Sequence, residues 1–309
     1  MMKRAVITGA NGSLGASLVQ LLLAQNIEVL ALVRKGADGA ANLPSHPLLR
    51  VAVCELNELH AFAPLAQMPA YDVFFHFAWN GTYGSPRDDV YLQSDNIRHT
   101  LDAISLAKRL GCSRFIGAGS QAEYGLPPEG EKLTSSTPTS PTSGYGIAKL
   151  TAGLLGGLHA KQLGIVFNWV RVLSIYGPME KPYSLTMSTI LSLLRGEETH
   201  FTKGGQLWDF LYCDDAARAF LLVAKHGRDG QTYVLGSGQP LALSEAITSI
   251  GKSINAQARL GIGDLPYPPN QIMYLCADIS LLTADTGFIP QIPYAQGIAK
   301  TIQQVKERL

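Results

Sequence analysis

The sequence predicts an α/β fold in which a doubly wound parallel sheet carries a smaller lobe toward the C-terminus. Two observations lead to this class. Short apolar runs, typical of buried strands, alternate with longer helical patterns as far as Val172. After Gly177 this alternation stops, and shorter segments punctuated by Pro and Gly replace it.

Each predicted element follows from one of these runs. The predicted strands are 5–8, 28–33, 50–53, 73–77, 114–117, 166–172 and 232–235. The predicted helices are 14–25, 90–110, 145–163 and 214–225. Because the last strand returns the chain to the main sheet, the two lobes are expected to interleave. We expect a main domain of residues 1–176 plus about 208–236, and a smaller lobe of about 177–207 and 237–309.

The composition is that of a globular protein with a small partner. The chain has 309 residues, of which 46% are hydrophobic, which is enough for a sizeable core. Charged residues make up 16% and the formal net charge is +1, so no strong field attracts nucleic acid or an anionic membrane. We therefore expect no nucleic-acid or membrane partner.

The cysteines and the N-terminus point to a reducing compartment. Four cysteines lie far apart with no paired spacing, which argues against a disulfide framework and against a metal site. No apolar stretch precedes the first strand, and no run is long enough to span a bilayer. We expect a cytoplasmic protein without a bound metal.

The stretch TGANGSLG, from Thr8 to Gly15, predicts a dinucleotide site of the Rossmann type. Gly9 permits a tight turn, Gly12 lets the backbone approach a pyrophosphate, and Gly15 lets the following helix pack closely on the strand. The pyrophosphate then lies at the N-terminal amides of that helix. Since the chain has 31 glycines, an ordinary glycine-rich turn is the alternative.

The end of the second strand bears on the choice of dinucleotide. Arg34 and Lys35 stand where NAD-preferring enzymes place an acidic residue for the ribose hydroxyls. Two cations and no anion favour a ribose phosphate, so NADP is the predicted cofactor and NAD the alternative. A solvated loop would also account for the two cations.

Three residues form a candidate catalytic set at the expected carboxyl edge of the sheet. Tyr145 and Lys149 are four residues apart in YGIAK, hence on one face of a helix. Such a pair also arises by chance, but its position is informative. Ser120 follows the fifth strand, at the edge where α/β sheets bind ligands.

Together these motifs resemble the extended short-chain dehydrogenase/reductase family, of the NAD(P)-dependent epimerase/dehydratase type. Three further segments agree with the resemblance, which covers nearly the whole chain. They are HFAW at 76–79, RVLSIYGP at 171–178 and GGQLWDFLYCDDAARA at 204–219.

The resemblance implies hydride transfer to or from a carbon that bears oxygen. Tyr145 would move the proton and Ser120 would hold the same oxygen. A charge on Lys149 about 5 Å away, at an effective dielectric near 20, would lower the pKa of the phenol by about two units. The family's lysine also binds the nicotinamide ribose.

The resemblance also implies a set of cofactor contacts. We expect the pyrophosphate near Gly9, Asn11, Gly12, Leu14 and Gly15. The ribose phosphate is expected at Arg34, the adenine beside Glu55 and Leu56, and the dinucleotide groove along Phe77 and Ala78.

Several positions depart from the family pattern. Gln121 and Ala122 replace the Asp-Glu pair with which dehydratases eliminate water, so dehydration is disfavoured. Trp208 stands where the family often has an arginine, and Ser174 where epimerases often have asparagine. Trp208 either stacks on a nucleobase or fills the interface between the lobes. The candidate substrate contacts are Thr82, Tyr83, Glu123, Ser174 and Trp208.

Three functions remain open. The first is a nucleotide-sugar epimerase or ketoreductase that transfers hydride at a sugar carbon, with C4 expected. The second is an NADPH-dependent reductase of a carbonyl compound without a nucleotide. It is favoured by the absence of the family's arginine at Trp208 and of a second one that the family commonly has near 269–274. The third is a dinucleotide-sensing protein without turnover. We also expect a homodimer formed through helices 90–110 and 145–163.

Overall fold

A seven-stranded parallel sheet forms the centre of the protein in the computed structural model. The model describes residues 2–36, 40, 42–63, 69–127, 129–269 and 271–309. The sheet strands are β1 (Arg4–Thr8), β2 (Glu28–Val33), β3 (Leu49–Val53), β4 (Val73–His76), β5 (Arg114–Ser120), β6 (Val166–Val172) and β10 (Thr232–Leu235). The predicted doubly wound parallel sheet is therefore confirmed, and β5 runs three residues further than predicted, so that Ser120 is its last residue.

The strand order places a ligand-binding edge at the middle of the sheet. The order is β10-β6-β5-β4-β1-β2-β3, and each pair of neighbours is parallel. The chain winds outward from β1 to β3 and then returns to the other side of β1 as β4. In open parallel sheets, ligands bind at such a reversal, outside the carboxyl ends of the strands.

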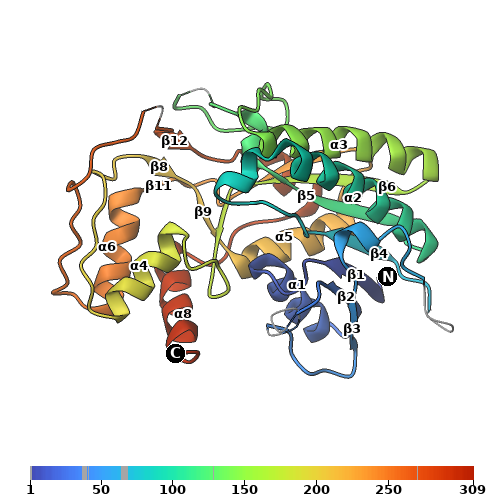
Figure 1. Cartoon of the computed structure of the whole chain (residues 1–309), viewed down its shortest axis with the longest axis horizontal. Coiled ribbons are helices and arrows are strands. Elements are labelled where there is room, and N and C mark those ends of the chain that lie inside the picture. Colours follow the sequence, from blue (N-terminus) through green and yellow to red (C-terminus); the bar gives the residue numbers. More distant parts are fainter. Residues whose placement is uncertain (1, 37–39, 41, 64–68, 128, 270) are drawn as a thin grey trace.

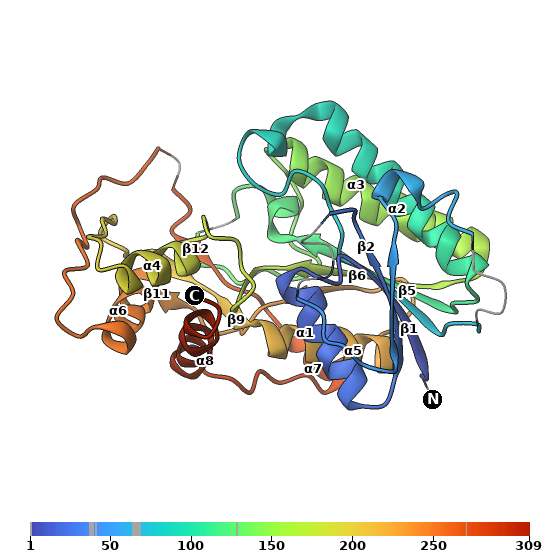
Figure 2. The same cartoon turned by 60° about the horizontal axis from the view of Figure 1, so that its bottom comes forward.

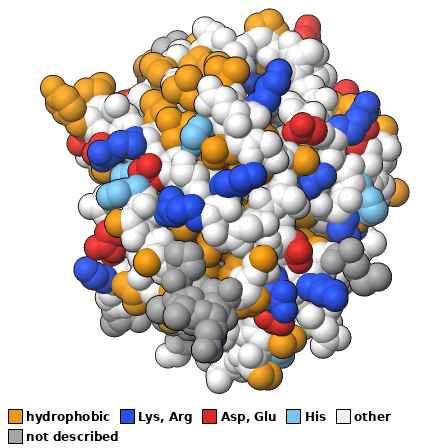
Figure 3. All heavy atoms as spheres, turned by 90° about the vertical axis from the view of Figure 1, so that its right-hand side faces the viewer, with side chains coloured by type: hydrophobic (Ala, Val, Ile, Leu, Met, Phe, Trp, Pro, Cys, Tyr) orange, Lys and Arg blue, Asp and Glu red, His pale blue; other side chains and the backbone are white. Residues whose placement is uncertain are grey.

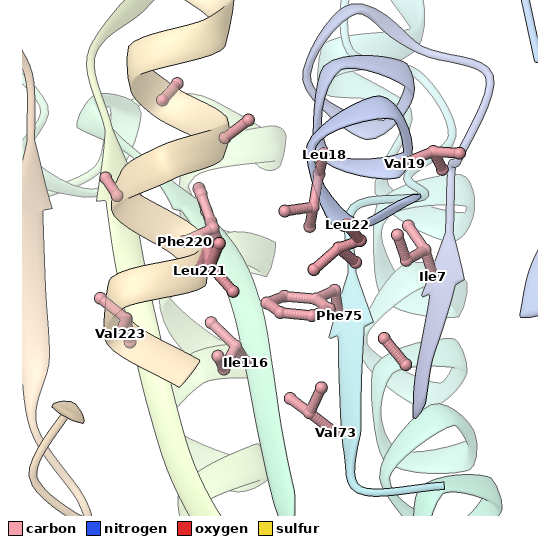
Figure 4. Packing of buried hydrophobic residues seen from close by; sticks show 14 of the residues in the cluster. Ile7, Leu18, Val19, Leu22, Val73, Phe75, Ile116, Phe220, Leu221 and Val223 are labelled. Atoms are coloured by element: carbon pink, nitrogen blue, oxygen red, sulfur yellow. The ribbon is translucent and has the colours of Figure 1, made fainter. Parts of the chain in front are cut away.

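Helices cover both faces of this sheet (Figure 2). One face carries α1 (Ser13–Ala24), α5 (Cys213–His226) and α7 (Ser280–Thr286), and the other carries α2 (Val90–Arg109) and α3 (Gly144–Leu163). Buried strand side chains alternate between the two resulting cores, as a period of two requires. In β1, Ala5 and Ile7 belong to the α1/α5 side and Val6 to the α2/α3 side. Figure 4 shows Phe75 of β4 packed between Leu22 and Ile116 in the first of these cores.

The smaller part of the molecule lies beyond the carboxyl edge of the sheet, at the left of Figure 1. Its short strands are β7 (Ser174–Tyr176), β8 (Leu207–Trp208), β9 (Phe210–Tyr212), β11 (Leu241–Ala242) and β12 (Tyr274–Leu275). Its helices are α4 (Leu185–Leu194), α6 (Leu243–Ile254) and α8 (Tyr294–Lys306). β7 pairs with β9, and β8 lies between β11 and β12. Among the described helices, none is long and apolar enough to cross a membrane.

Candidate active site

The turn between β1 and α1 depends on two glycines for steric reasons. Gly9 has a φ of +68°, which side chains rarely adopt, and a Cβ there would lie 2.7 Å from the amide nitrogen of Ala78. A Cβ on Gly15 would collide with the carbonyl oxygen of Gly9. Both glycines therefore let the turn, the helix and the end of β4 approach one another.

Packing within the protein does not require a glycine at position 12. Its φ of −76° is ordinary, and a Cβ there would meet only the carbonyl oxygen of Gly9, at 3.4 Å. Gly12 is the N-cap of α1, where no side chain caps the helix among the described residues. The first amides of α1 therefore face open space that a Cβ would fill, which fits a pyrophosphate.

The other predicted pyrophosphate contacts lie at the same turn. The carbonyl oxygen of Asn11 accepts a hydrogen bond from Nδ2 of Asn42 at 2.9 Å. Leu14 packs against the core on the α1 side. Ser13, which the sequence analysis did not select, has a buried hydroxyl with no hydrogen-bond partner among the described residues.

The segment after β3 holds the end of β2 in place. A carboxylate oxygen of Glu55 accepts from the backbone amide of Lys35 at 2.7 Å, and Glu55 and Glu58 cap each other's backbone in a short 3-10 turn. The Lys35 ammonium lies 3.6 Å from Glu58. Arg34 is exposed and forms no ion pair with the described residues. Of the two cations, Arg34 is thus the one open to a ligand.

Phe77 and Ala78 lie beside the glycine turn, and their contact with a dinucleotide stays a prediction. The amide nitrogen of Phe77 donates to the carbonyl oxygen of Thr8 at 3.2 Å. The ring of Phe77 packs edge-on against Phe220 of α5, with centroids 4.8 Å apart. Leu56 packs against the core on the other face of the sheet.

The N-terminus of α3 positions the catalytic candidates. Ser143 is the N-cap, and its hydroxyl accepts from the amide of Gly146 at 3.1 Å. The amide of Gly144 donates to the Asp88 carboxylate at 2.9 Å, which ties α3 to the turn that follows β4. Because Tyr145 lies between Gly144 and Gly146, these two bonds fix the position of its backbone.

The side chain of Lys149 extends from α3 to the carboxyl-terminal half of β5. Its ammonium donates to the carbonyl oxygen of Ala118 in β5 at 2.7 Å and lies 3.7 Å from the ring of Trp79. Burial lowers the pKa of Lys149 to about 7. Its Nζ is 5.8 Å from the ring centroid of Tyr145, so the predicted pair does converge.

The predicted fall in the pKa of Tyr145 is not found in this structure. Burial raises the pKa of the Tyr145 phenol, and the neighbouring Ser120 hydroxyl and the Arg87 guanidinium only oppose that rise. Because the pKa of Lys149 is itself about 7, its side chain carries only part of a charge near neutral pH. The guanidinium of Arg87 lies 4.3 Å from the centre of the Tyr145 ring.

Glu123 lies behind Ser120. The carboxylate, a predicted substrate contact, is fully buried. It forms an ion pair with Arg171 at 2.7 Å and accepts from the amide of Ser120 at 2.8 Å and from Nε1 of Trp169 at 2.9 Å. In this arrangement Glu123 supports the end of β5 from within the protein.

The remaining substrate candidates make separate contacts with their neighbours. Nε1 of Trp208 donates to the Ser174 hydroxyl at 2.6 Å, so these two residues satisfy each other. Tyr83 stacks on Tyr183 with ring centroids 4.0 Å apart, although both rings are exposed. The carbonyl oxygen of Thr82 accepts from Arg87 at 2.9 Å.

Arg87 and Tyr183 were missed by sequence reasoning. Arg87 lies in a short 3-10 helix (Ser85–Asp88) and Tyr183 in the turn before α4, and neither belongs to a recognisable motif. The only available signal for Arg87 was its place after the fourth strand, at the ligand-binding edge. No group of three or more His, Cys, Asp or Glu side chains among the described residues is arranged to hold a metal ion.

A glycine turn open to a pyrophosphate and a Ser-Tyr-Lys set at the same sheet edge agree with the match to known families. The NAD dependent epimerase/dehydratase family matches residues 5–236. The chain belongs to this family. It is therefore an enzyme of the extended short-chain dehydrogenase/reductase type with a nicotinamide dinucleotide cofactor.

Relatives in the epimerase/dehydratase family extend along the whole chain. dTDP-glucose 4,6-dehydratase of Streptomyces niveus is 24% identical over 98% of this chain and 87% of its own length. UDP-glucose 4-epimerase of Mycolicibacterium smegmatis is 24% identical over 97% of each. The structure of UDP-N-acetylglucosamine 4-epimerase from Methanobrevibacter ruminantium, in complex with UDP-N-acetylmuramic acid, has a TM-score of 0.88 and 21% identity over 100% of this chain and 99% of that one. This last similarity establishes the fold.

Proposed function

We propose that this enzyme transfers hydride at C4 of a nucleotide-linked sugar, as a 4-epimerase or a 4-ketoreductase. The observation that carries the proposal is the meeting of Ser120, Tyr145 and Lys149 at the sheet edge beside the open glycine turn. The relatives named above act on UDP- and dTDP-sugars by their names. Gln121 and Ala122 leave the site without the acid and base of a dehydratase.

The chain's own residues would handle the substrate oxygen and its proton. The Tyr145 hydroxyl passes a proton to or from the sugar oxygen, and the Ser120 hydroxyl holds that same oxygen. Lys149 lies close enough to orient both the phenol and a ribose. When bound, the nicotinamide supplies or accepts the hydride. Gly9, Gly12 and Gly15 would hold the dinucleotide through the backbone.

NADP is the proposed dinucleotide because Arg34 is open while Lys35 is engaged by Glu58. We expect Arg34→Glu to weaken NADPH binding by at least about tenfold and to leave NADH binding unchanged. Arg50→Glu, an exposed site on β3, is the matched control. Equal losses for both dinucleotides, or tighter binding of NADH by the wild type, would contradict the NADP assignment.

A carbonyl substrate without a nucleotide is the second candidate. It is favoured by the hydrogen bond between Trp208 and Ser174. The family often has an arginine and an asparagine at these two positions, and here the two side chains bind each other. The non-catalytic alternative has no such support, since the catalytic set is complete.

A homodimer through α2 and α3 also belongs to the proposal. These helices expose apolar side chains at Val90, Tyr91, Ile147, Leu154, Leu155 and Leu158. Figure 3 shows hydrophobic side chains gathered at the top of one face, the side on which α3 lies in Figure 1. We expect light scattering to give twice the chain mass, and Leu158→Lys to halve it. Ile289→Lys, at another exposed apolar residue, should leave the mass unchanged.

Turnover of nucleotide sugars tests the function itself. Purified enzyme is incubated with NADPH and a panel of nucleotide-linked 4-keto sugars, and with NAD and the corresponding 4-hydroxy sugars. Tyr145→Phe should reduce kcat by about 10²–10⁴ and leave dinucleotide binding intact. Reduction of small ketones with no turnover of any nucleotide sugar would instead support the second candidate.

A further inference from the structure

Trp79 contacts two members of the candidate catalytic set. It is partly buried and lies three residues beyond the end of β4. The Lys149 Nζ lies 3.7 Å from the centre of its ring, well within the range of a cation–π interaction. The rings of Trp79 and Tyr145 meet nearly at right angles, with centroids 6.1 Å apart. The indole of Trp79 therefore packs against both the phenol and the ammonium.

Two buried amide side chains of α2 hold this ring in place. The indole Nε1 of Trp79 donates to Oε1 of Gln93 at 3.0 Å, and Nε2 of Gln93 donates to the carbonyl oxygen of Gly81 at 2.9 Å. The Asn96 side chain accepts from the amide of Asn80 at 3.0 Å and donates to its carbonyl oxygen at 2.9 Å. Because Gln93 and Asn96 are almost fully buried, their bonds fix the segment that carries the ring.

Little else in the structure favours the charged form of Lys149. Its ammonium donates to the carbonyl oxygen of Ala118 and forms no ion pair with the described residues. Glu123 raises the pKa of Lys149, but that carboxylate already forms an ion pair with an arginine. His76 is near enough to interact with Lys149, yet burial lowers the pKa of His76 to about 3, so it is neutral. Burial likewise raises the pKa of the Tyr145 phenol, which is uncharged.

We propose that Trp79 is a positioning residue of this site: its indole face binds the Lys149 ammonium, favours the charged form and holds it beside Tyr145. The inference rests on the proposed function, in which the charge of Lys149 helps Tyr145 to release its proton. An apolar side chain without a ring would also exclude water, but it would not attract the cation. The charge of Lys149 near neutral pH should therefore depend on the ring.

NMR of the intact protein tests the contact first. Lysine is supplied with ¹³C at the ε-methylene, and the Lys149 signal is assigned by its absence in Lys149→Met. The face of an aromatic ring shifts nearby protons upfield, so we expect the ε-methylene protons of Lys149 to resonate upfield of those of exposed lysines. An unshifted Lys149 signal in the wild type would overturn the proposal, even if every Trp79 variant failed to fold.

A pH titration of the same signal measures the pKa of Lys149. We expect Trp79→Leu to lower this pKa by about one unit, because apolar cover remains and the attraction of the ring is lost. Trp79→Phe keeps a ring face and should stay within about half a unit of the wild type. Phe62→Leu is the matched control: it alters a partly buried aromatic residue of the same core, near the last residue of α2, and should leave the pKa unchanged. An unchanged or raised pKa in Trp79→Leu would show that the indole only covers Lys149, and would overturn the proposal.

Turnover separates this proposal from the function on which it rests. In Trp79→Leu at neutral pH, the charged fraction of Lys149 would fall from about a half to about a tenth. We therefore expect the 4-hydroxy sugar to be oxidised about fivefold more slowly, and Trp79→Phe to restore most of the rate. Equal rates for Trp79→Leu and the wild type would overturn the positioning role. If the wild type turns over no nucleotide sugar, the proposed function fails, while the NMR titration still decides whether Trp79 holds the charge of Lys149.

Discussion

The glycine turn before α1 and the Trp208–Ser174 pair, which we place at the mouth of the proposed substrate cleft, are held in different ways. At the turn, Gly12 leaves the amides of α1 open, and no side chain caps the helix among the described residues. At the mouth, polar side chains bind one another, as Trp208 and Ser174 do. Recognition by the backbone depends on glycines whose spacing is visible in sequence. Recognition by side chains depends on pairs that only the fold brings together.

The largest expected effect concerns the support behind Ser120. Glu123→Ala would remove, in a buried site, the acceptor of the Arg171 Nε, the Trp169 Nε1 and the Ser120 amide. We expect a loss of about 3–5 kcal/mol in the free energy of unfolding, measured by urea denaturation. Glu131→Ala, at an exposed carboxylate, should change it little. A stable Glu123→Ala protein that fails in turnover would instead make Glu123 a substrate contact.

Substitutions at Gly15 and Gly12 should separate an effect on folding from an effect on dinucleotide binding. Gly15→Ala forces a Cβ into the backbone of Gly9, and we expect it to cost about 1–3 kcal/mol of unfolding free energy. Gly12→Ala has room within the protein and should cost about 1 kcal/mol or less, yet weaken dinucleotide binding by roughly tenfold or more.

Denaturation and fluorescence titration of NADPH measure these two quantities on each variant. If Gly12→Ala binds NADPH as the wild type does, the open space before α1 does not hold the pyrophosphate.

Arg87 is expected to affect the rate because its positive charge lowers the pKa of the Tyr145 phenol. Without this cation the pKa of the phenol rises further, so the phenolate forms only at higher pH. For Arg87→Gln we expect roughly tenfold slower alcohol oxidation at neutral pH, with the rising limb of the pH–kcat profile displaced upward. Arg87→Lys should restore much of the rate. A slower enzyme with an unmoved profile would show a purely structural role.

The smallest effect is expected for the hydrogen bond between Trp208 and Ser174. Trp208→Phe keeps an aromatic wall but removes the donor to the Ser174 hydroxyl. We expect a loss of about 1 kcal/mol in the free energy of unfolding, measured by thermal or urea denaturation. Ser174→Ala should cost a similar amount, and the double variant should cost less than the sum of the two. Additive losses would show that Trp208 and Ser174 do not stabilise each other through this hydrogen bond.

The fold was predictable because its signals are local. Each strand of the main sheet was expected within a few residues, since buried parallel strands are short apolar runs. The convergence of Ser120, Tyr145 and Lys149 was likewise marked by spacing and by the sheet edge, while their catalytic role stays a prediction. Arg87 was not, because its contact with Tyr145 depends on how the loop after β4 meets α3. The burial of Glu123 was also invisible, since Arg171, its partner, is 48 residues away in sequence.

Transfer of a deuterium label would show directly whether hydride passes between the dinucleotide and C4 of the sugar. NADPH deuterated at C4 of the nicotinamide is incubated with the enzyme and a panel of nucleotide-linked 4-keto sugars, and the products are analysed by mass spectrometry and NMR. We expect deuterium on C4 of the sugar with one of the two stereochemically labelled cofactors, and its loss in Tyr145→Phe. Products without deuterium, or equal labelling by Tyr145→Phe, would contradict hydride transfer at this Ser-Tyr-Lys site.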